Sequence, residues 1–318
     1  MAARIVVLGN INQDFVMRAE RMPRPGETIL GDDLRFVAGG KGANQSVTAA
    51  RLGAQVALIG CVGRDAFGPT LLDNLRREGV DTQHVGLDDD IATGAAFIAL
   101  APDGQNSILS VGGANMAVTP QHVEAAAPAI AQADMCLVQF AVPIESVERF
   151  IALAREHDVP VLLDPTPAMD RLPVNWHQAS ILTPNETETE YVIGYVCPDR
   201  ATAVQAAREI HSRGVNIAVV KQGPDGCIVC DADGCRLVGG YRVDVVDTTG
   251  AGDAFAAGLG VALAEGLPVN QALAFANACG ALACTRFGAQ TSLPHRSEVE
   301  ALLADRGGLA GATVTALT

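Results

Sequence analysis

The sequence predicts an α/β protein in which helices cover both faces of a mostly parallel central sheet. Three observations predict this class: the chain has 318 residues, 49% of them are hydrophobic, and short β-branched runs alternate with longer helical patterns. The same composition excludes a disordered chain. Ligands of such sheets bind beyond the carboxyl ends of the strands, so the chemistry is expected there.

Strands and helices are expected to alternate along the chain. Runs rich in Val, Ile and Leu predict strands at 4–9, 55–60, 135–140, 159–164, 180–185 and 216–223. Helical periodicity is found at 70–78, 144–157, 201–213, 251–286 and 297–304. We expect the last dozen residues, GGLAGATVTALT, to form a frayed tail.

Two stretches break this rhythm, because they read as short strands joined by turns at Pro25-Gly26 and Asp103-Gly104. They predict a small β-sheet, which can serve as a lid over a binding cleft or as a structural or dimer-forming sheet. The expected β-lid comprises residues 14–36 and 94–111. The expected α/β domain comprises residues 1–13, 37–93 and 112–318.

The charge balance excludes several classes of partner. The chain carries 22 Lys and Arg against 36 Asp and Glu, a net charge of −14, which repels the phosphates of nucleic acids and anionic lipids. The longest nearly uncharged stretch, 254–264, is too short to cross a bilayer. The initial run MAARIVVLGN lacks the features of a signal peptide, so we expect a cytoplasmic protein with neither nucleic acid nor membrane as partner.

Eight cysteines are scattered along the chain. In a large chain of intracellular type, most are expected as small buried apolar residues rather than as disulfides. Cys227, Cys230 and Cys235 could instead hold zinc, but no His lies nearby and no second CxxC pair follows. Core packing is therefore the favoured interpretation of these three.

The most informative segment is DTTGAGDAFAAG, residues 247–258, which follows a strand-like run, YRVDVV, at 241–246. Gly250 and Gly252 permit a tight turn and leave N–H groups free at a helix N-terminus, where a phosphate can bind. Asp253 lies in the first turn, where the helix dipole favours its ionised, proton-accepting form. The competing interpretation is a Gly-rich turn with an Asp cap.

Two common nucleotide signatures are missing from the sequence. A G-x-x-x-x-G-K-[ST] loop does not occur, and no G-x-G-x-x-G follows the first predicted strand. Any ATP is therefore not held by a Walker loop, and a NAD-dependent enzyme is disfavoured.

Further polar groups stand at predicted helix starts and strand ends. In AGGKGANQ, Gly39 and Gly40 can act as a hinge and allow close approach of a ligand, while Lys41 and Asn44 offer polar side chains. A loop with a solvated lysine is the alternative. Asn12 and Asp14 lie just after the first predicted strand. Each is either a ligand for a sugar hydroxyl or a turn residue.

The segment TPNETETE, residues 183–190, predicts a magnesium site. Asn185 and Glu188 are three residues apart and can face one side of a helical turn. Amide and carboxylate oxygens suit Mg²⁺, which keeps most of its waters and takes few protein ligands. The alternative is a solvated acidic helix start with good capping groups.

Five segments in order, GNINQD, GGKGANQ, PNETE, DTTGAGD and TRFGAQ, resemble the PfkB family of carbohydrate kinases, and within it the ribokinases, over about residues 4–304. The resemblance implies a ribokinase-like three-layer α/β/α domain with a β-lid. It implies transfer of the γ-phosphoryl group of ATP to a primary hydroxyl of a small sugar, most closely ribose or a related pentose. It also implies a homodimer formed through the lid.

The resemblance also implies roles for individual residues. Asp253 is implied as the general base, and the N–H groups of Gly250, Ala251, Gly252 and Asp253 as the anion hole. The implied sugar ligands are Asn12, Asp14, Gly40, Lys41, Asn44 and Asp253. The implied ATP site comprises Asn185, Lys221, Gly223, Gly226, Gly252 and Asn277, with Asn185 and Glu188 holding Mg²⁺ through water. A monovalent cation, usually K⁺, is implied at Asp247, Thr249, Ala283, Arg286, Gly288 and Ser292.

The chain departs from the ribokinases at two positions. Ala141 stands where those enzymes carry a glutamate that bonds to ribose, and the loss of such an acceptor can change specificity strongly. Lys221 stands where they usually have Thr, as in family members that act on fructose or ketodeoxygluconate. A nucleoside, ketose or ketodeoxygluconate kinase and a non-catalytic sugar-binding protein therefore remain alternatives.

Overall fold

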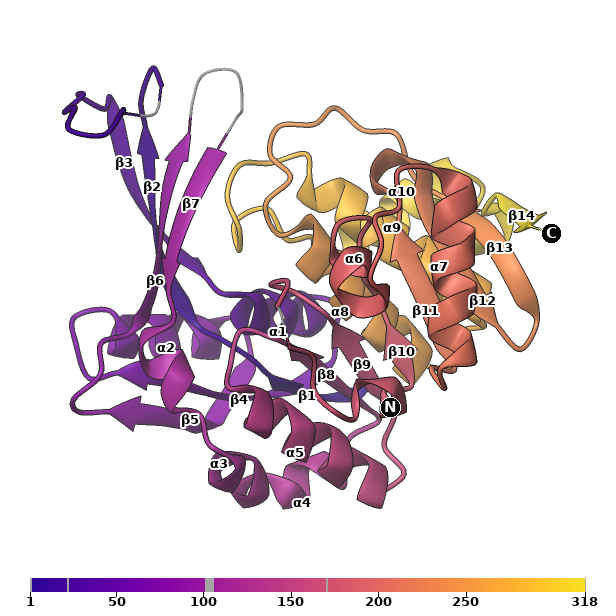
Figure 1. Ribbon diagram of the computed structural model, residues 1–318, viewed down its shortest axis with the longest axis horizontal. Coiled ribbons are helices and arrows are strands. Elements are labelled where there is room, and N and C mark those ends of the chain that lie inside the picture. Colours follow the sequence, from indigo (N-terminus) through magenta and orange to yellow (C-terminus); the bar gives the residue numbers. More distant parts are fainter. Residues whose placement is uncertain (1, 22, 101–105, 170, 318) are drawn as a thin grey trace.

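The computed structural model describes residues 2–21, 23–100, 106–169 and 171–317. A large sheet forms the centre of the molecule (Figure 1). In spatial order its ten strands are β14 (Val314–Leu317), β13 (Gly234–Gly239), β12 (Gly226–Asp231), β11 (Ile217–Lys221), β10 (Ile181–Leu182), β9 (Val161–Asp164), β8 (Met135–Gln139), β1 (Arg4–Leu8), β4 (Gln55–Gly63) and β5 (Val80–Asp88).

The sheet is parallel from β5 to β11 and antiparallel from β11 to β14. Its central strands are buried on both faces, as expected for parallel strands covered by helices. In β1, Ile5 and Val7 face one hydrophobic core while Val6 and Leu8 face the other, because successive side chains of a strand point to opposite sides. The predicted class, with helices on both faces of a mostly parallel sheet, is confirmed.

Two sets of helices cover these two faces. The first comprises α1 (Lys41–Arg51), α2 (Gly68–Arg77), α8 (Ala251–Ala264), α9 (Val269–Ala283) and α10 (Arg296–Asp305). The second comprises α3 (Pro120–Ala125), α4 (Ala127–Ile130), α5 (Ile144–Glu156), α6 (Glu188–Ile193) and α7 (Arg200–Ser212). Short 3-10 turns add η1 (Gly113–Ala117), η2 (Trp176–Gln178), η3 (Gly223–Asp225) and η4 (Leu309–Gly311).

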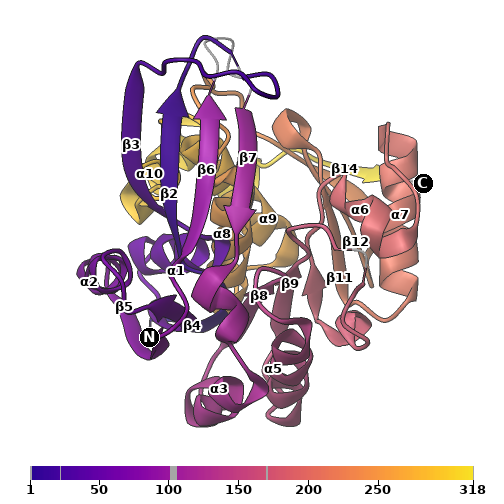
Figure 2. The same ribbon diagram turned by 60° about the vertical axis from the view of Figure 1, so that its left-hand side comes forward.

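A second, four-stranded sheet forms the lid, and Figure 2 shows it rising from one side of the body. Its strands, in spatial order, are β3 (Asp33–Gly39), β2 (Asn12–Arg18), β6 (Gly94–Leu100) and β7 (Asn106–Val111). The predicted Pro25-Gly26 turn lies between β2 and β3. The predicted Asp103-Gly104 turn lies outside the described residues.

Two predictions of local structure are wrong. Within the expected frayed tail, Val314–Leu317 forms β14, which pairs antiparallel with β13 and so covers an edge that would otherwise be open. The strand-like run at 241–246 is irregular. Val245 and Val246 are 63% and 62% exposed, so the second half of the run has no apolar layer to pack against.

The cysteines differ from expectation at one pair. Cys230 and Cys235 stand opposite each other in β12 and β13 and form a disulfide, since adjacent antiparallel strands bring their side chains together. The other six are free, and five of them are buried, as expected of small apolar residues. Within the described ranges, no cluster of His, Cys, Asp and Glu has the arrangement of a metal site, and no helix is both long and apolar enough to cross a membrane.

Candidate active site

Polar residues gather where the carboxyl ends of the central strands meet the N-termini of α1 and α8. Asp164 ends β9 and Lys221 ends β11, while Lys41 and Asn44 stand in the first turn of α1. Asp253 stands in the first turn of α8. These segments lie far apart in the sequence, and the parallel sheet brings them to one edge (Figure 1).

The N-terminus of α8 carries amide groups that are available to an anion. Gly250 has φ +79°, a left-handed conformation that favours glycine, and the helix begins directly after it. The Ala251 N–H donates to the Thr248 carbonyl oxygen at 3.2 Å, so it is not free. The N–H groups of Gly250, Gly252 and Asp253 have no acceptor within the described part of the chain. Three amides of the implied anion hole are thus open.

The Asp253 carboxylate is buried and held by α1. Asn44 Nδ2 donates to its Oδ2 at 2.8 Å, and Gln45 Nε2 lies 3.4 Å from its Oδ1. Burial raises the pKa of Asp253, although the positive charge of Lys41 and these hydrogen bonds act in the opposite direction. Desolvation thus acts against the helix dipole, which favours the ionised form. A raised pKa makes the carboxylate a stronger base.

The predicted sugar ligands lie next to this carboxylate. Burial raises the pKa of Asp14 to about 7, with a further increase from the nearby charge of Asp253. Asp14 Oδ1 and Asn44 Oδ1 are buried and have no hydrogen-bond partner among the described residues. Asn12 Oδ1 accepts a hydrogen bond from Asn115 Nδ2 at 2.8 Å. Unpaired buried acceptors are costly, so hydroxyl donors of a ligand would stabilise this site.

The paired glycines before α1 are required by close packing. At Gly40, φ is +93° and a Cβ would lie 2.7 Å from the Asn10 carbonyl oxygen. A Cβ on Gly39 would overlap the Asp14 carboxylate. Glycine at both positions lets the end of β3 lie against β2 at the ligand site.

Asn185 and Glu188 meet as predicted, and they also cap α6. Asn185 Oδ1 accepts the N–H of Glu188 at 2.8 Å, and Glu188 Oε2 accepts the N–H of Asn185 at 2.8 Å. Burial raises the pKa of Glu188, while the charge of Lys221 lowers it. The capping and magnesium interpretations are thus compatible, since each side chain has further lone pairs.

Lys221 is held between two carboxylates. Its Nζ donates to Asp164 Oδ1 at 2.9 Å and lies 3.7 Å from Glu188 Oε2. Burial alone would lower the pKa of Lys221, but Asp164 and Glu188 together raise it. Gln45 Nε2 donates to Asp164 Oδ2 at 3.1 Å, which connects this cluster to the Asp253 site.

The other predicted ATP residues lie around β12 and β13. Gly223 and Gly226 have φ of +52° and +99° in the turn that follows β11. Asn277, on α9, donates from Nδ2 to the carbonyl oxygens of Val238 and Gly239, each at 3.1 Å. Asn277 therefore fixes the end of β13, and its side-chain amide is already engaged.

Four of the residues implied for a monovalent cation are brought together. Asp247 Oδ1 accepts from Thr249 Oγ1 at 2.7 Å, Asp247 Oδ2 accepts the Gly288 N–H at 2.9 Å, and Ser292 Oγ lies 3.5 Å from the Thr249 carbonyl oxygen. The Arg286 side chain instead pairs with Glu298 at 2.7 Å, and Ala283 is buried at the end of α9. In Arg286 and Ala283, the backbone carbonyl oxygens are the groups that could bind a cation.

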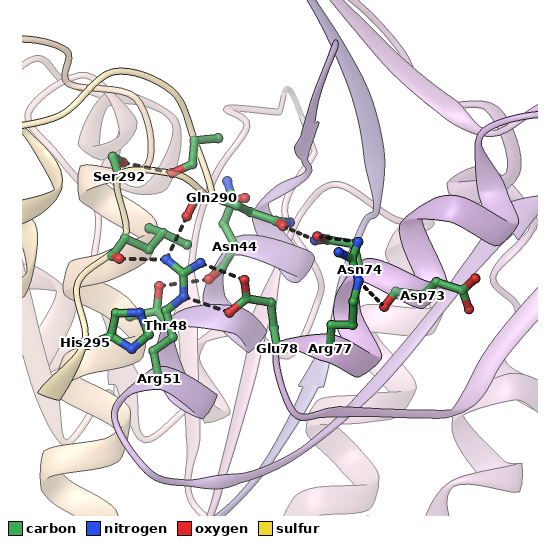
Figure 3. A network of polar contacts seen from close by, with 12 residues as sticks. Asn44, Thr48, Arg51, Asp73, Asn74, Arg77, Glu78, Gln290, Ser292 and His295 are labelled. Carbon is green, nitrogen blue, oxygen red and sulfur yellow. Dashed lines mark hydrogen bonds and ion pairs between the residues drawn. The ribbon is translucent and has the colours of Figure 1, made fainter.

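Arg51, at the end of α1, fastens the loop that contains Ser292 (Figure 3). Its Nη1 donates to the carbonyl oxygens of Gln290 at 2.8 Å and Leu293 at 2.7 Å. Its other donors form a two-point pair with Glu78, both at 2.8 Å. The loop is thereby tied to the helix that carries Asn44.

Comparison with known proteins agrees with this geometry. The model of the pfkB family carbohydrate kinases matches residues 2–296. The chain belongs to the PfkB family of carbohydrate kinases. Its family membership, together with the buried Asp253 at the start of α8, makes it a phosphotransferase with an alcohol acceptor.

Several PfkB proteins are similar to the chain over nearly its full length. A ribokinase of Bacillus subtilis is 39% identical over 299 residues, covering 94% of this chain and 99% of the relative. A ribokinase of Haemophilus influenzae is 38% identical over 298 residues, covering 94% and 97%. A structure of Arabidopsis thaliana ribokinase complexed with ribose and ATP has a TM-score of 0.86 at 34% identity, covering 95% of this chain and 99% of that one.

Several residues of this PfkB site were not singled out by the sequence. Asp164 ends a predicted strand and Gln45 stands inside the GGKGANQ segment, so position alone could have indicated both. Gln139, at the end of β8, donates to Gln45 Oε1 and is the second-last residue of the strand predicted at 135–140. Nothing in the sequence pattern marks Asn115 or Arg51, whose partners are backbone groups and side chains distant in sequence.

Proposed function

We propose that the chain transfers the γ-phosphoryl group of ATP to a primary hydroxyl of ribose. The observation that carries this proposal is the buried Asp253 carboxylate beside three open amides and two buried acceptors without a partner among the described residues, Asp14 Oδ1 and Asn44 Oδ1. Ribose as acceptor is supported by the similarity to ribokinases. ATP as donor is supported by the similarity to an Arabidopsis thaliana ribokinase complexed with ribose and ATP, and we propose a cytoplasmic location.

The proposed reaction uses the groups at the start of α8. The sugar hydroxyl loses its proton to Asp253, whose raised pKa makes it a competent base. The hydroxyl oxygen forms a bond to the γ-phosphorus while the bond to the ADP oxygen breaks. The Gly252 and Asp253 amides stabilise the negative charge on the transferred group. Asp14 and Asn44 orient the sugar so that its hydroxyl faces Asp253.

Two cations are part of the proposal. Mg²⁺ on the ATP phosphates, reached through water from Asn185 and Glu188, would neutralise phosphate charge. Both side chains fit this role because they have lone pairs left after capping α6. K⁺ would be held at Asp247, Thr249, Gly288 and Ser292, which hydrogen bonds already bring together, and by backbone oxygens near Ala283 and Arg286.

The test is ATP turnover with Mg²⁺ and K⁺ against ribose, deoxyribose, fructose, ketodeoxygluconate and several nucleosides, repeated with Na⁺ replacing K⁺. We expect ribose to give the highest kcat/KM and K⁺ to give higher turnover than Na⁺. Preference for a ketose or a nucleoside would contradict ribose as substrate. Folded protein that binds ATP and sugar without turnover would contradict catalysis and favour a sugar-binding role.

The Ala141 position tests how the pocket achieves its specificity. Ala141 lies two residues after the end of β8, and its methyl side chain carries no hydrogen-bond acceptor. We expect Ala141→Glu to raise kcat/KM for ribose by about tenfold, roughly the 1.4 kcal/mol of one hydrogen bond. Unchanged or lower values for ribose would mean that the pocket is built around another sugar.

We propose a homodimer formed through the outer face of the lid. Cross-strand pairing places Phe36, Phe97 and Leu109 on one face, with side chains 61%, 40% and 70% exposed. An apolar sheet face of this kind favours burial against a second copy. A groove of about 740 Å³ runs along the same face.

Sedimentation measures this association directly. We expect wild-type protein to sediment at about twice the 32.9 kDa chain mass, and a Phe36→Asp and Leu109→Asp double variant as a monomer. Val174→Asp is the matched control, because Val174 is 72% exposed away from the lid strands. A monomeric wild type at micromolar concentration would contradict the proposal.

A further inference from the structure

Lys221 lies beside the first turn of α8. A Cβ added to Gly252 would lie 3.6 Å from Lys221 Nζ, so the ammonium group is adjacent to the open amides of the anion hole. The Lys221 side chain is only 12% exposed. A charge so close to these amides can reach an anion that binds to them.

The ammonium group retains unused hydrogen-bonding capacity. An ammonium has three N–H donors, and within the described part of the chain Nζ makes one hydrogen bond, to Asp164 Oδ1 at 2.9 Å. Glu188 Oε2, at 3.7 Å, is too distant for a second. Lys221 can therefore donate to a further acceptor while it keeps its bond to Asp164.

Asp164 is fixed on its other sides, and this fixes Lys221. Thr183 Oγ1 donates to Asp164 Oδ1 at 3.3 Å and Gln45 Nε2 donates to Asp164 Oδ2 at 3.1 Å. Asp164 is itself only 1% exposed. The ammonium is thus held in position before any ligand arrives, which is the condition for effective stabilisation of a transition state.

A purely structural ion pair explains this arrangement less well. Backbone pairing with β10 already connects β9 to β11, so the fold does not need the pair to join these strands. Buried ion pairs also contribute little net stability, because desolvation offsets the attraction between the charges. A buried cation next to an anion site has a clearer use in binding phosphate.

We propose that Lys221 is a catalytic residue that donates hydrogen bonds to the γ-phosphoryl oxygens of ATP, with Asp164 as its positioning residue. This inference rests on the proposed kinase function. In the reaction the sugar oxygen bonds to the γ-phosphorus, the bond from phosphorus to the ADP oxygen breaks, and Asp253 takes the hydroxyl proton. Lys221 keeps its protons throughout and stabilises the charge of the transferred group.

Affinities for ATP and ADP separate this role from a structural one, because only ATP carries the γ-phosphoryl group. In Lys221→Met we expect kcat to fall about 10²–10³-fold, with the KM for ribose within about threefold of wild type. Calorimetry with Mg²⁺ should show the ratio of ATP to ADP affinity falling about 30-fold, as expected for one charged hydrogen bond. Lys221→Arg should retain a higher kcat and a higher ratio of ATP to ADP affinity than Lys221→Met.

Arg236→Met is the matched control. Arg236 forms an equally buried pair with Asp231, both 9% exposed, at 2.7 Å in β12 and β13. This variant should lose stability without changing the ATP to ADP ratio. If Lys221→Met does not fold, Asp164→Asn provides the same readouts, with a smaller fall in the ratio because the ammonium loses its anchor.

Equal weakening of ATP and ADP, or a kcat of Lys221→Met within threefold of wild type, would overturn the role of Lys221. An inactive wild type on every sugar would instead contradict the proposed function. Even then the affinity ratio remains measurable, so the two failures are distinguishable.

Discussion

Replacing Asp253 by Asn is expected to lower kcat by about 10³-fold, the usual contribution of a general base. The substitution removes the proton acceptor and keeps the size of the side chain. Asn44 remains a neighbour at hydrogen-bond distance, so the local geometry is preserved. Affinity for ATP is expected to stay within a few-fold of wild type. Steady-state kinetics together with calorimetry of ATP binding measure both quantities.

The pH profile provides an independent check on Asp253. Because burial raises its pKa, wild-type kcat should fall as the pH decreases toward that pKa and the carboxylate becomes protonated. The residual activity of Asp253→Asn should lack this limb. Asp305→Asn is the control, since Asp305 is 77% exposed at the end of α10. Turnover of Asp253→Asn near the wild-type rate would exclude Asp253 as the base.

Patterns that depend on neighbouring residues in the sequence predicted most of the fold. The apolar runs at 4–9, 55–60 and 135–140 became β1, β4 and β8, because strands buried on both faces are continuously apolar. The two wrong predictions of local structure share a cause. Whether 241–246 or Val314–Leu317 becomes a strand depends on which segment reaches the open edge of β13, and that is a property of the tertiary structure.

In the candidate site, too, neighbouring residues in the sequence predicted some features, whereas others depend on the tertiary structure. Asp253, Asp14 and Asn44 lie in segments whose Gly-rich or polar character was visible in the sequence, and the structure brings them together. Their protonation was not predictable, because the pKa of Asp253 depends on burial created by α1. The strand-end position of Asp164 was visible in the sequence, but its ion pair with Lys221, 2.9 Å away, is a property of the tertiary structure.

Asp14 makes the stability of the ligand-free protein depend on pH. Its pKa is raised from 3.8 to about 7 in the folded state, so between these values the folded chain binds a proton that the unfolded chain does not. The stabilising contribution is fully present below about pH 4 and is lost as the pH rises through 7. At pH 8 the ionised, buried carboxylate costs up to about 4 kcal/mol. Asp253, whose pKa is also raised, contributes with the same sign.

Asp14→Asn separates the contribution of Asp14 to stability from its contribution to binding. Denaturant unfolding should show that the variant loses part of the decrease in unfolding free energy between pH 5 and pH 8, while Asp305→Asn keeps the wild-type slope. The same variant should raise the KM for ribose by about 30-fold, the equivalent of one charged hydrogen bond of about 2 kcal/mol.

Bound ribose should oppose the loss of stability that the wild type shows as the pH rises. Hydroxyl donors to Asp14 Oδ1, which has no partner among the described residues, favour the ionised form and lower the pKa of Asp14. Saturating ribose should therefore stabilise the protein more at pH 8 than at pH 5, and the KM for ribose should rise as the pH falls below about 7. A ribose affinity independent of pH from 5 to 8 would show that the Asp14 carboxylate does not accept a sugar hydroxyl.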